Sequence, residues 1–279
     1  MSSYATTIQF LKGQGIDAFR FLSSDAIVVA DRICVALQLF TLPLVNTDAG
    51  PKPLTRIGEL GLPPLNNGFD IGHLVFWNMP GENLVAGNKC LRSDVDTYTK
   101  PFIKASDDII SVLVNVRDER GAPGLIDNLS FVVHLSALLH HHSSFSSYGN
   151  PQDIRVLPWR MWGPPVTRWF DHAYESRNVC GQRCLLTNLL TWKICDFNPY
   201  RVRRLGKDFA EESETSRLSV ETAMSCVKSD GIKDGVYSSL PYVKVAPKQW
   251  PLRGRISLDD DRILIQRVSP DRYLQFYVR

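Results

Sequence analysis

The stretch Phe19–Val29, FRFLSSDAIVV, and the run Ala36–Phe40, ALQLF, contain the pattern that decides the fold. An acidic turn at Asp25 precedes a run of β-branched and apolar residues, and a short connection leads to a second apolar run. Asp and Ser side chains at turns bond nearby backbone amides, which fixes the point where a strand begins. The stretch therefore predicts a β-hairpin unit.

The same unit recurs later in the chain. Ile256–Ile265, ISLDDDRILI, is followed by Tyr273–Tyr277, YLQFY, and Ala105–Leu113 repeats the first half of the unit. Helical periodicity is nearly absent, and short apolar runs separated by Gly, Pro, Asn and Asp are typical of strands and turns. Repeated hairpins favour a propeller with blades of about 40–45 residues, about six at most in this chain. We expect an all-β, β-propeller-like (WD-repeat-like) domain, incomplete or irregular, with blades of four antiparallel strands.

The sequence predicts one such domain over residues 1–279, with an N-terminal extension at 1–18 and a loop insertion at 205–236. Within that insertion, the polar stretch Glu211–Cys226 is either a helix or a loop. The C-terminal strand Arg272–Arg279 either pairs with an N-terminal strand that closes the ring or forms an exposed edge. The predicted strands are Ala18–Leu22, Ala26–Ala30, Val35–Leu42, Gly72–Trp77, Ile110–Val116, Phe131–Leu138, Ile154–Leu157, Cys184–Asn188, Thr191–Phe197, Val243–Val245, Arg262–Arg267 and Tyr273–Val278.

Composition excludes several classes of partner. The formal charge of +3 is too small to predict binding to nucleic acid or to an anionic membrane surface. No apolar run approaches the ~18 residues that a membrane-spanning helix needs, and the start lacks the pattern of a secretory signal. The six cysteines are too few for a disulfide scaffold in a chain of this length. We therefore expect a soluble cytoplasmic and/or nuclear protein, without nucleic-acid or membrane partners.

The most specific local motif is Val156–Phe170, VLPWRMWGPPVTRWF. It resembles the PW…WGPPVTRWF segment of the F-box protein family expanded in mushroom-forming fungi. The resemblance depends on the order of further segments along the chain rather than on any single one. In that order they are Phe21–Val29, Leu37–Pro43, Leu60–Leu65, Phe131–Leu139, Cys180–Leu185, Asp196–Arg204, Tyr237–Val245 and Asp259–Ile265.

In that family the corresponding region is the propeller-like part that follows the F-box. The F-box docks the adaptor of a cullin ubiquitin ligase. Residues 1–18 are too few for this helical motif, so we do not expect adaptor docking, and ligase activity is not carried over. The resemblance implies a protein-interaction module, similar to a substrate-recognition region without its F-box, for an unidentified protein partner.

An aromatic and arginine-rich group within the motif is the candidate partner-binding site. Trp and Arg are enriched at interface hot spots, which favours a recognition surface. Large aromatic rings also pack propeller cores, so packing in the core and between blades is the alternative. The residues are Trp159, Trp162, Arg168, Trp169 and Phe170.

Three clusters invite a metal or catalytic reading. His140–His142 cannot all face one ion from a strand, so we expect a polar loop there rather than a metal site. Cys180 and Cys184 lack the second pair that a zinc site needs, so we expect buried or free thiols, and Cys34 is expected in the core. Asp259–Asp261 occupies the repeated turn position, which favours a solvated turn over a carboxylate site.

Arg201–Arg204 is the densest basic cluster, and we expect it at a strand end against the acidic stretch 208–214 rather than at a phosphate or an interface. No nucleophile and base occur in a known catalytic spacing. We therefore expect no enzyme activity, catalytic residue, cofactor or metal. The alternatives are a β-fold hydrolase with converging carboxylates, and a propeller that binds a small ligand or glycan in an aromatic-lined hollow.

Overall fold

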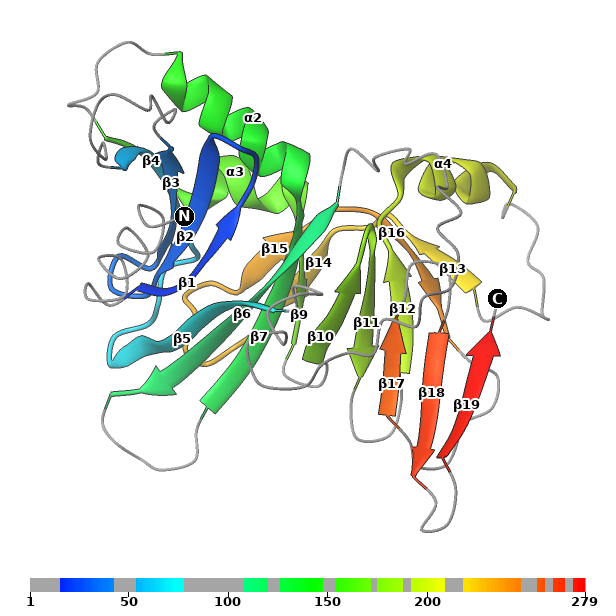
Figure 1. Ribbon diagram of the computed structural model, residues 1–279. Coiled ribbons are helices and arrows are strands. Elements are labelled where there is room, and N and C mark those ends of the chain that lie inside the picture. The colour runs from blue at the N-terminus through cyan, green and yellow to red at the C-terminus, as the bar shows by residue number, and fades with distance from the viewer. Residues whose placement is uncertain are drawn as a thin grey trace.

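A computed structural model describes residues 16–42, 54–77, 108–119, 126–147, 154–171, 175–187, 192–208, 218–246, 255–258, 263–268 and 273–278. Within these residues the protein is mostly β-strand, arranged in several separate sheets (Figure 1). Neighbouring strands are antiparallel, except for one parallel pair in the first sheet. The all-β prediction is confirmed at this level.

The first sheet contains the hairpin that opened the sequence analysis. Its strands, in spatial order, are β1 (Ile16–Phe21), β2 (Ala26–Asp31), β3 (Ala36–Thr41), β4 (Thr55–Gly61) and β8 (Arg155–Leu157). The β2 and β3 strands are buried on both faces, which explains their uninterrupted apolar sequence. The turn between them is held by the Asp31 carboxylate, which accepts backbone hydrogen bonds from Ile33 at 2.9 Å and Cys34 at 3.0 Å.

The other sheets repeat the antiparallel arrangement. The second sheet contains, in spatial order, β5 (Phe69–Trp77), β6 (Ile109–Asp118), β7 (Ile126–His134) and β9 (Thr167–Phe170). The third sheet contains β10 (Glu175–Cys180), β11 (Arg183–Thr187), β12 (Trp192–Asp196), β16 (Tyr242–Val245) and β13 (Leu218–Glu221). The last contains β17 (Arg255–Leu258), β18 (Ile263–Val268) and β19 (Tyr273–Val278), and β14 (Ser225–Val227) pairs with β15 (Val236–Ser238) as a separate hairpin. The largest hydrophobic core joins the first two sheets to this hairpin, and a second core joins the second and third sheets.

The described residues include three helices that the sequence analysis missed: α2 (Leu135–Ser146), α3 (Trp159–Val166) and α4 (Pro199–Asp208). The predicted strand Phe131–Leu138 ends at His134, so the expected loop at His140–His142 is wrong, and these residues lie in α2. The expected strand end at Arg201–Arg204 is likewise wrong, because Asn198 starts α4 there by accepting the backbone amides of Tyr200 and Arg201.

Several smaller expectations also change. The expected loop insertion at 205–236 contains the end of α4 and the strands β13 and β14, and β1 begins at Ile16, inside the expected extension. Cys34, expected in the core, is exposed in the turn after β2. The residues 209–217 and 259–262, with the turn at Asp259–Asp261, lie outside the described residues.

Closure of a ring is not found among the described strands. There, β19 pairs with β18 alone and β1 with β2 alone, so no sheet closes on itself. None of the described helices is long and apolar enough to cross a membrane.

Candidate functional site

The aromatic group predicted to bind a partner lies inside the protein. Trp159 and Trp162 sit on α3, Trp169 lies on β9, and each ring is at most 6% exposed. Trp159 meets Trp162 and Trp169 edge to face, with ring centroids 5.2 Å and 5.6 Å apart, and Trp169 stacks on Phe131 at 4.8 Å. The Trp162 indole donates to the backbone carbonyl of Gly61 at 2.8 Å. These rings therefore fasten α3 and β4 to the second sheet.

Arg168 is buried beside them, at 3% exposure. Its guanidinium donates to the backbone carbonyls of Leu240 at 2.9 Å and Ala223 at 3.1 Å, and to the Ser225 hydroxyl at 2.8 Å. It also lies over the Tyr242 ring, with 5.1 Å to the centroid. Burial lowers the pKa of Arg168, with the nearby Tyr242 and Glu221 acting in the opposite direction. Arg168 therefore connects β9 to the segments on either side of the β14–β15 hairpin.

The five residues of this group are therefore core residues in the described conformation and are not displayed as a binding surface. Phe170, the fifth member, is 6% exposed and packs edge to face on Tyr242 at 6.0 Å in the second core. Each of the five side chains is occupied by internal contacts, so a partner would find none of them at the surface.

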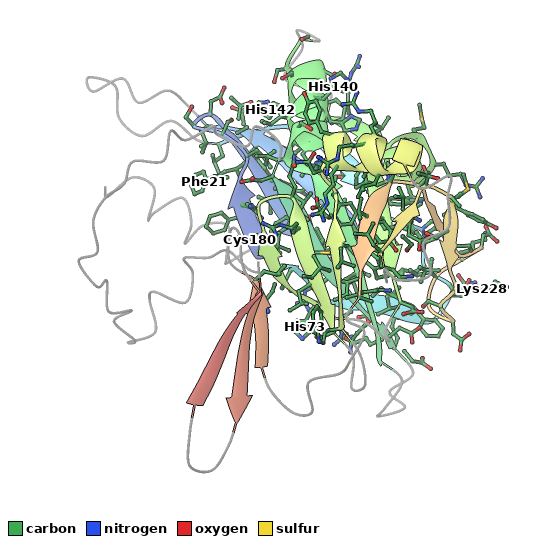
Figure 2. The ribbon with its side chains drawn as sticks, turned by 90° about the vertical axis from the view of Figure 1, so that its right-hand side faces the viewer. Phe21, His73, His140, His142, Cys180 and Lys228 are labelled. Atoms are coloured by element: carbon green, nitrogen blue, oxygen red, sulfur yellow. The ribbon has the colours of Figure 1, made fainter. Side chains whose placement is uncertain are left out.

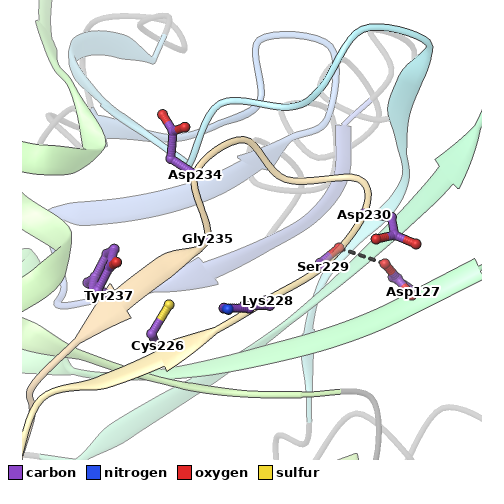
Figure 3. A pocket seen from close by; sticks show the side chains of 8 residues that line it. All are labelled: Asp127, Cys226, Lys228, Ser229, Asp230, Asp234, Gly235 and Tyr237. Carbon is purple, nitrogen blue, oxygen red and sulfur yellow. Dashed lines mark hydrogen bonds between the residues drawn. The ribbon is translucent and has the colours of Figure 1, made fainter.

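A pocket of about 440 Å³ opens on the outer side of the β14–β15 hairpin (Figure 3). Tyr237, Cys226 and Lys228 follow one another along the hairpin in this view, with Asp127 and Asp230 beyond Lys228. The complete lining is Asp127, Cys226, Lys228, Ser229, Asp230, Asp234, Gly235 and Tyr237.

The hairpin forms this outer surface by strict alternation. Cys226 is the cross-strand partner of Tyr237, and both face outward, Tyr237 with 51% of its surface exposed. Val227 and Val236, one position away, are buried in the main core. The chain enters β15 through Asp234 and Gly235, whose φ angles of 64° and 72° are in the left-handed region that Asp-Gly turns adopt readily.

The loop between the two strands is anchored at several points. Ile232 is 3% exposed in the main core, and Gly231 lies so close to β6 that a Cβ atom there would overlap the Val116 side chain. Asn66 donates its side-chain amide to the carbonyl of Asp230 at 2.8 Å, and its backbone amide to Gly231 at 3.0 Å. These contacts hold the loop in one conformation, so the side chains that line the pocket are presented on a fixed backbone.

The charged groups of the pocket are mostly acidic. The lining contains three carboxylates and one ammonium group, that of Lys228. Asp127 accepts a hydrogen bond from the Ser229 hydroxyl at 2.6 Å, and Asp234 forms an exposed ion pair with Arg160 of α3 at 3.6 Å. The pocket can therefore accept hydrogen bonds from a cationic group at one end and contact an apolar group on the Tyr237 ring.

The histidine cluster does not converge on one point. His140 is exposed, while the His142 ring is buried with Nε2 3.1 Å from the Thr41 hydroxyl, and Figure 2 shows the two along α2. His141 lies edge to face on Trp162 at 6.3 Å. Across the part of the chain that the structure describes, no group of three His, Cys, Asp or Glu side chains is arranged to hold a metal ion.

The remaining candidates are placed as follows. Cys184 and Cys195 are buried thiols, as predicted, and Cys180 is not disulfide-bonded. Arg201 forms an ion pair with Asp196 at 2.7 Å, whereas Arg203 and Arg204 are exposed on α4. The basic cluster is thus partly used to hold the start of α4 against β12.

Comparisons with known proteins return nothing: no family model, curated protein or solved structure matches the chain. The sequence analysis did not single out the pocket, although a signal was present. Asp234-Gly235 is a turn signal directly before the short strand Val236–Ser238. It does not give the pairing of Tyr237 with Cys226, because residues 228–235 separate the two strands, whereas a two-residue Asp-Gly turn would have placed Tyr237 opposite Ile232.

Proposed function

We propose that the chain is a protein-interaction module that binds an extended basic segment of a partner protein along the outer side of the β14–β15 hairpin. The observation that carries the proposal is the pocket itself, where an exposed aromatic ring and an excess of carboxylates are displayed on an anchored loop. Partly exposed Tyr side chains are favoured at interfaces because they offer large contact area at little entropic cost.

The charged side chains of the pocket determine which kind of partner segment can bind there. A lysine or arginine side chain placed near Asp127 and Asp230 would be attracted by both carboxylates, whereas an acidic side chain would be repelled. Tyr237 and the exposed Met224, at 63% exposure, provide apolar contact further along the hairpin. The best-fitting occupant is therefore a segment with an apolar side chain followed or preceded by a basic one.

The finer fold belongs to the same proposal. We interpret these four sheets as blades of an irregular propeller, because three of them contain at least four strands and their first strands, β1, β5, β10 and β17, follow one another along the chain. This interpretation agrees with the resemblance to the recognition region of fungal F-box proteins. A separate hairpin inserted between β13 and β16 is an irregularity of the kind that such a propeller can use for binding.

The two rival functions find less support in the pocket. A glycan-binding hollow would be lined by several aromatic rings, and the eight described lining residues include one, Tyr237. A hydrolase with converging carboxylates would bring them to one point, whereas Asp127 accepts a hydrogen bond from Ser229, and Asp234 lies apart from it in Figure 3 and pairs with Arg160. Recognition without chemistry therefore fits the described lining best.

The proposal is tested by selecting random displayed peptides on the intact chain and measuring the affinity of the selected sequences by fluorescence anisotropy. We expect the selected peptides to carry Lys or Arg beside an apolar residue. Asp230→Lys should weaken their binding more than tenfold, since it replaces an attractive charge with a repulsive one. Selection of acidic peptides, or binding that Asp230→Lys leaves unchanged, would refute the proposal.

A matched pair of tyrosine variants locates the site. Tyr237→Ser should weaken binding about tenfold, equivalent to about 1.4 kcal/mol, because the ring supplies the apolar contact. Tyr200→Ser removes a tyrosine that is 76% exposed on α4, away from the pocket, and should leave the affinity unchanged. Equal losses in both variants would place the binding surface elsewhere.

A further inference from the structure

The solvent-facing side of α4 combines an aromatic ring with two arginines. Tyr200 is 76% exposed, and Arg203 and Arg204, three and four residues later, are exposed on the same side of the helix. The opposite side is fixed to the protein, because Val202 is buried and α4 packs on β13 and β16. The helix therefore presents these three side chains to solvent in a fixed direction.

Arg203 is already ordered on the ring of Tyr200. Its guanidinium carbon lies 5.0 Å from the ring centroid, and its Nε donates to the backbone carbonyl of Pro199 at 3.2 Å. Within the described part of the chain, no carboxylate pairs with Arg203 or Arg204. An arginine that is held in place before binding loses less side-chain entropy in a complex than a mobile one.

The pocket at the β14–β15 hairpin has the complementary features. The carboxylates of Asp127 and Asp230 lie at one end of the hairpin, and the half-exposed ring of Tyr237 lies further along it (Figure 3). Such a pocket attracts a basic group that stands beside an apolar ring. Figure 1 shows α4 over the third sheet, apart from the hairpin, so the two surfaces do not meet within one chain.

We propose that a second copy of this chain occupies the pocket, with its α4 placing Arg203 against Asp127 and Asp230 and Tyr200 against Tyr237. The inference rests on the proposed function and names a partner for the same site, with one face of a helix in place of an extended segment. Each chain contributes its pocket to one contact and its α4 to another, so the association is head-to-tail and continues beyond two chains as the concentration rises.

The contact is expected to be weak. It involves few side chains, all near solvent, and the ammonium group of Lys228 opposes the arginines. We therefore expect a dissociation constant on the order of 100 µM. At the much lower concentrations that suffice for measuring the affinity of selected peptides, the chain is a monomer, and Tyr200→Ser remains a valid control there.

Sedimentation equilibrium of the full chain tests the contact. At low salt the average mass should rise with concentration above that of one chain, and high salt should return it to the monomer, because the attraction is between charges. Asp230→Lys disables the pocket, and Arg203→Gln with Arg204→Gln disables α4, so each variant alone should remain a monomer. Arg155→Gln, an exposed arginine of the first sheet, is the control and should associate as the unchanged chain does.

Mixing the two defective chains gives the decisive measurement. The α4 of the Asp230→Lys chain is intact, and so is the pocket of the chain with Arg203→Gln and Arg204→Gln, so an equimolar mixture regains one contact. Its average mass should rise toward that of two chains and stop there. A mixture that stays monomeric, or single variants that associate as the unchanged chain does, would overturn the inference.

The proposed function is judged by a different result. If basic peptides bind the pocket while the mixture stays monomeric, the proposed function stands and the second copy is not the occupant. If the mixture forms pairs of chains but no basic peptide is selected, the self-association stands and the extended partner segment is refuted.

Discussion

The two sides of the β14–β15 hairpin differ strongly in solvent exposure. Val236 and Ser238 are completely buried, whereas Tyr237 between them is 51% exposed. The Ser238 hydroxyl accepts a hydrogen bond from the backbone amide of Trp169 at 3.0 Å, so the inner side is fastened to β9. Residues one position apart thus serve the fold and the proposed binding site separately, and each can be changed without the other.

The inner side supports the outer one through Arg168. Its guanidinium donates to Ala223 before β14, to Ser225 at the start of β14 and to Leu240 after β15. Both ends of the hairpin are therefore fixed to the second sheet by one side chain. Variants of the inner side should lower stability, and variants of the outer side should change binding alone.

Arg168→Met should cause the largest loss of stability. Methionine fills much of the volume but leaves three carbonyls and a hydroxyl without this donor, which costs about 3 kcal/mol of unfolding free energy. Urea denaturation measures this loss. Arg160→Met is the control, because Arg160 is exposed and its ion pair with Asp234 spans 3.6 Å, so its change should stay within about 0.5 kcal/mol. Similar losses in both would mean that Arg168 does not fasten the hairpin.

Gly163→Ala should have the next largest effect. A Cβ atom at this position of α3 would overlap the Trp159 ring, so the aromatic cluster has to shift, at a cost of about 1–3 kcal/mol. Gly206→Ala makes the same change in α4, where no atom lies within 4 Å of the new Cβ. That control should be neutral or stabilising by up to about 1 kcal/mol, since alanine favours a helix over glycine. Equal effects in thermal unfolding would contradict the packing described for α3.

How far the sequence could predict this fold depends on what holds each element. Alternating or continuous apolar runs gave the central strands, such as Ala26–Ala30 for β2, and Tyr273–Val278 coincides with β19. The helix α3 could not be found in this way, because it contains Gly163, Pro164 and Pro165, which disfavour a helix locally. Packing of its tryptophans against distant strands stabilises it, and local patterns do not report such contacts.

The other misses have different physical causes. The apolar run from Phe131 continues across the junction of β7 and α2, and the helix starts at His134 without a side-chain cap or an acidic first turn. No start signal was therefore available. The start of α4 was predictable, since Asn198 followed by Pro199 is a typical helix beginning. For the candidate site, residue types suggested Trp and Arg, but burial depends on tertiary contacts that the sequence alone did not provide.

Acidification should weaken the packing of α2 on the first sheet, by less than Arg168→Met or Gly163→Ala lowers the stability. Burial lowers the pKa of His142, partly offset by the Asp25 carboxylate and by a hydrogen bond with the Phe40 backbone, and burial also lowers the pKa of His141. The folded state therefore binds fewer protons than the unfolded state. Its stability is complete above the ordinary histidine pKa of 6.5 and falls as the pH drops below that value.

Urea midpoints measured between pH 7.5 and pH 5.5 test this expectation. The midpoint should decrease over the range, and His142→Gln should flatten the dependence, since glutamine can still bond to the Thr41 hydroxyl, which lies 3.1 Å from His142 Nε2. His140→Gln is the control, because His140 is exposed on the same helix. A midpoint that is constant with pH, or flattened equally by His140→Gln, would exclude His142 as the titrating group.

The smallest effect on stability is expected on the outer side of the β14–β15 hairpin. Variants there test most directly whether the outer and inner sides of the hairpin have separate roles. Tyr237→Ser removes a half-exposed ring and should change the unfolding free energy by no more than about 1 kcal/mol, the range of strand preferences. The same variant should bind the selected peptides about tenfold more weakly. Arg168→Met should instead unfold at a lower urea concentration than the unchanged protein. If Tyr237→Ser unfolds the protein as readily as Arg168→Met, the ring belongs to the fold, and the two sides of the hairpin are not separable. If stability is kept and binding is lost, the outer side is a surface that the partner needs and the core beneath it does not.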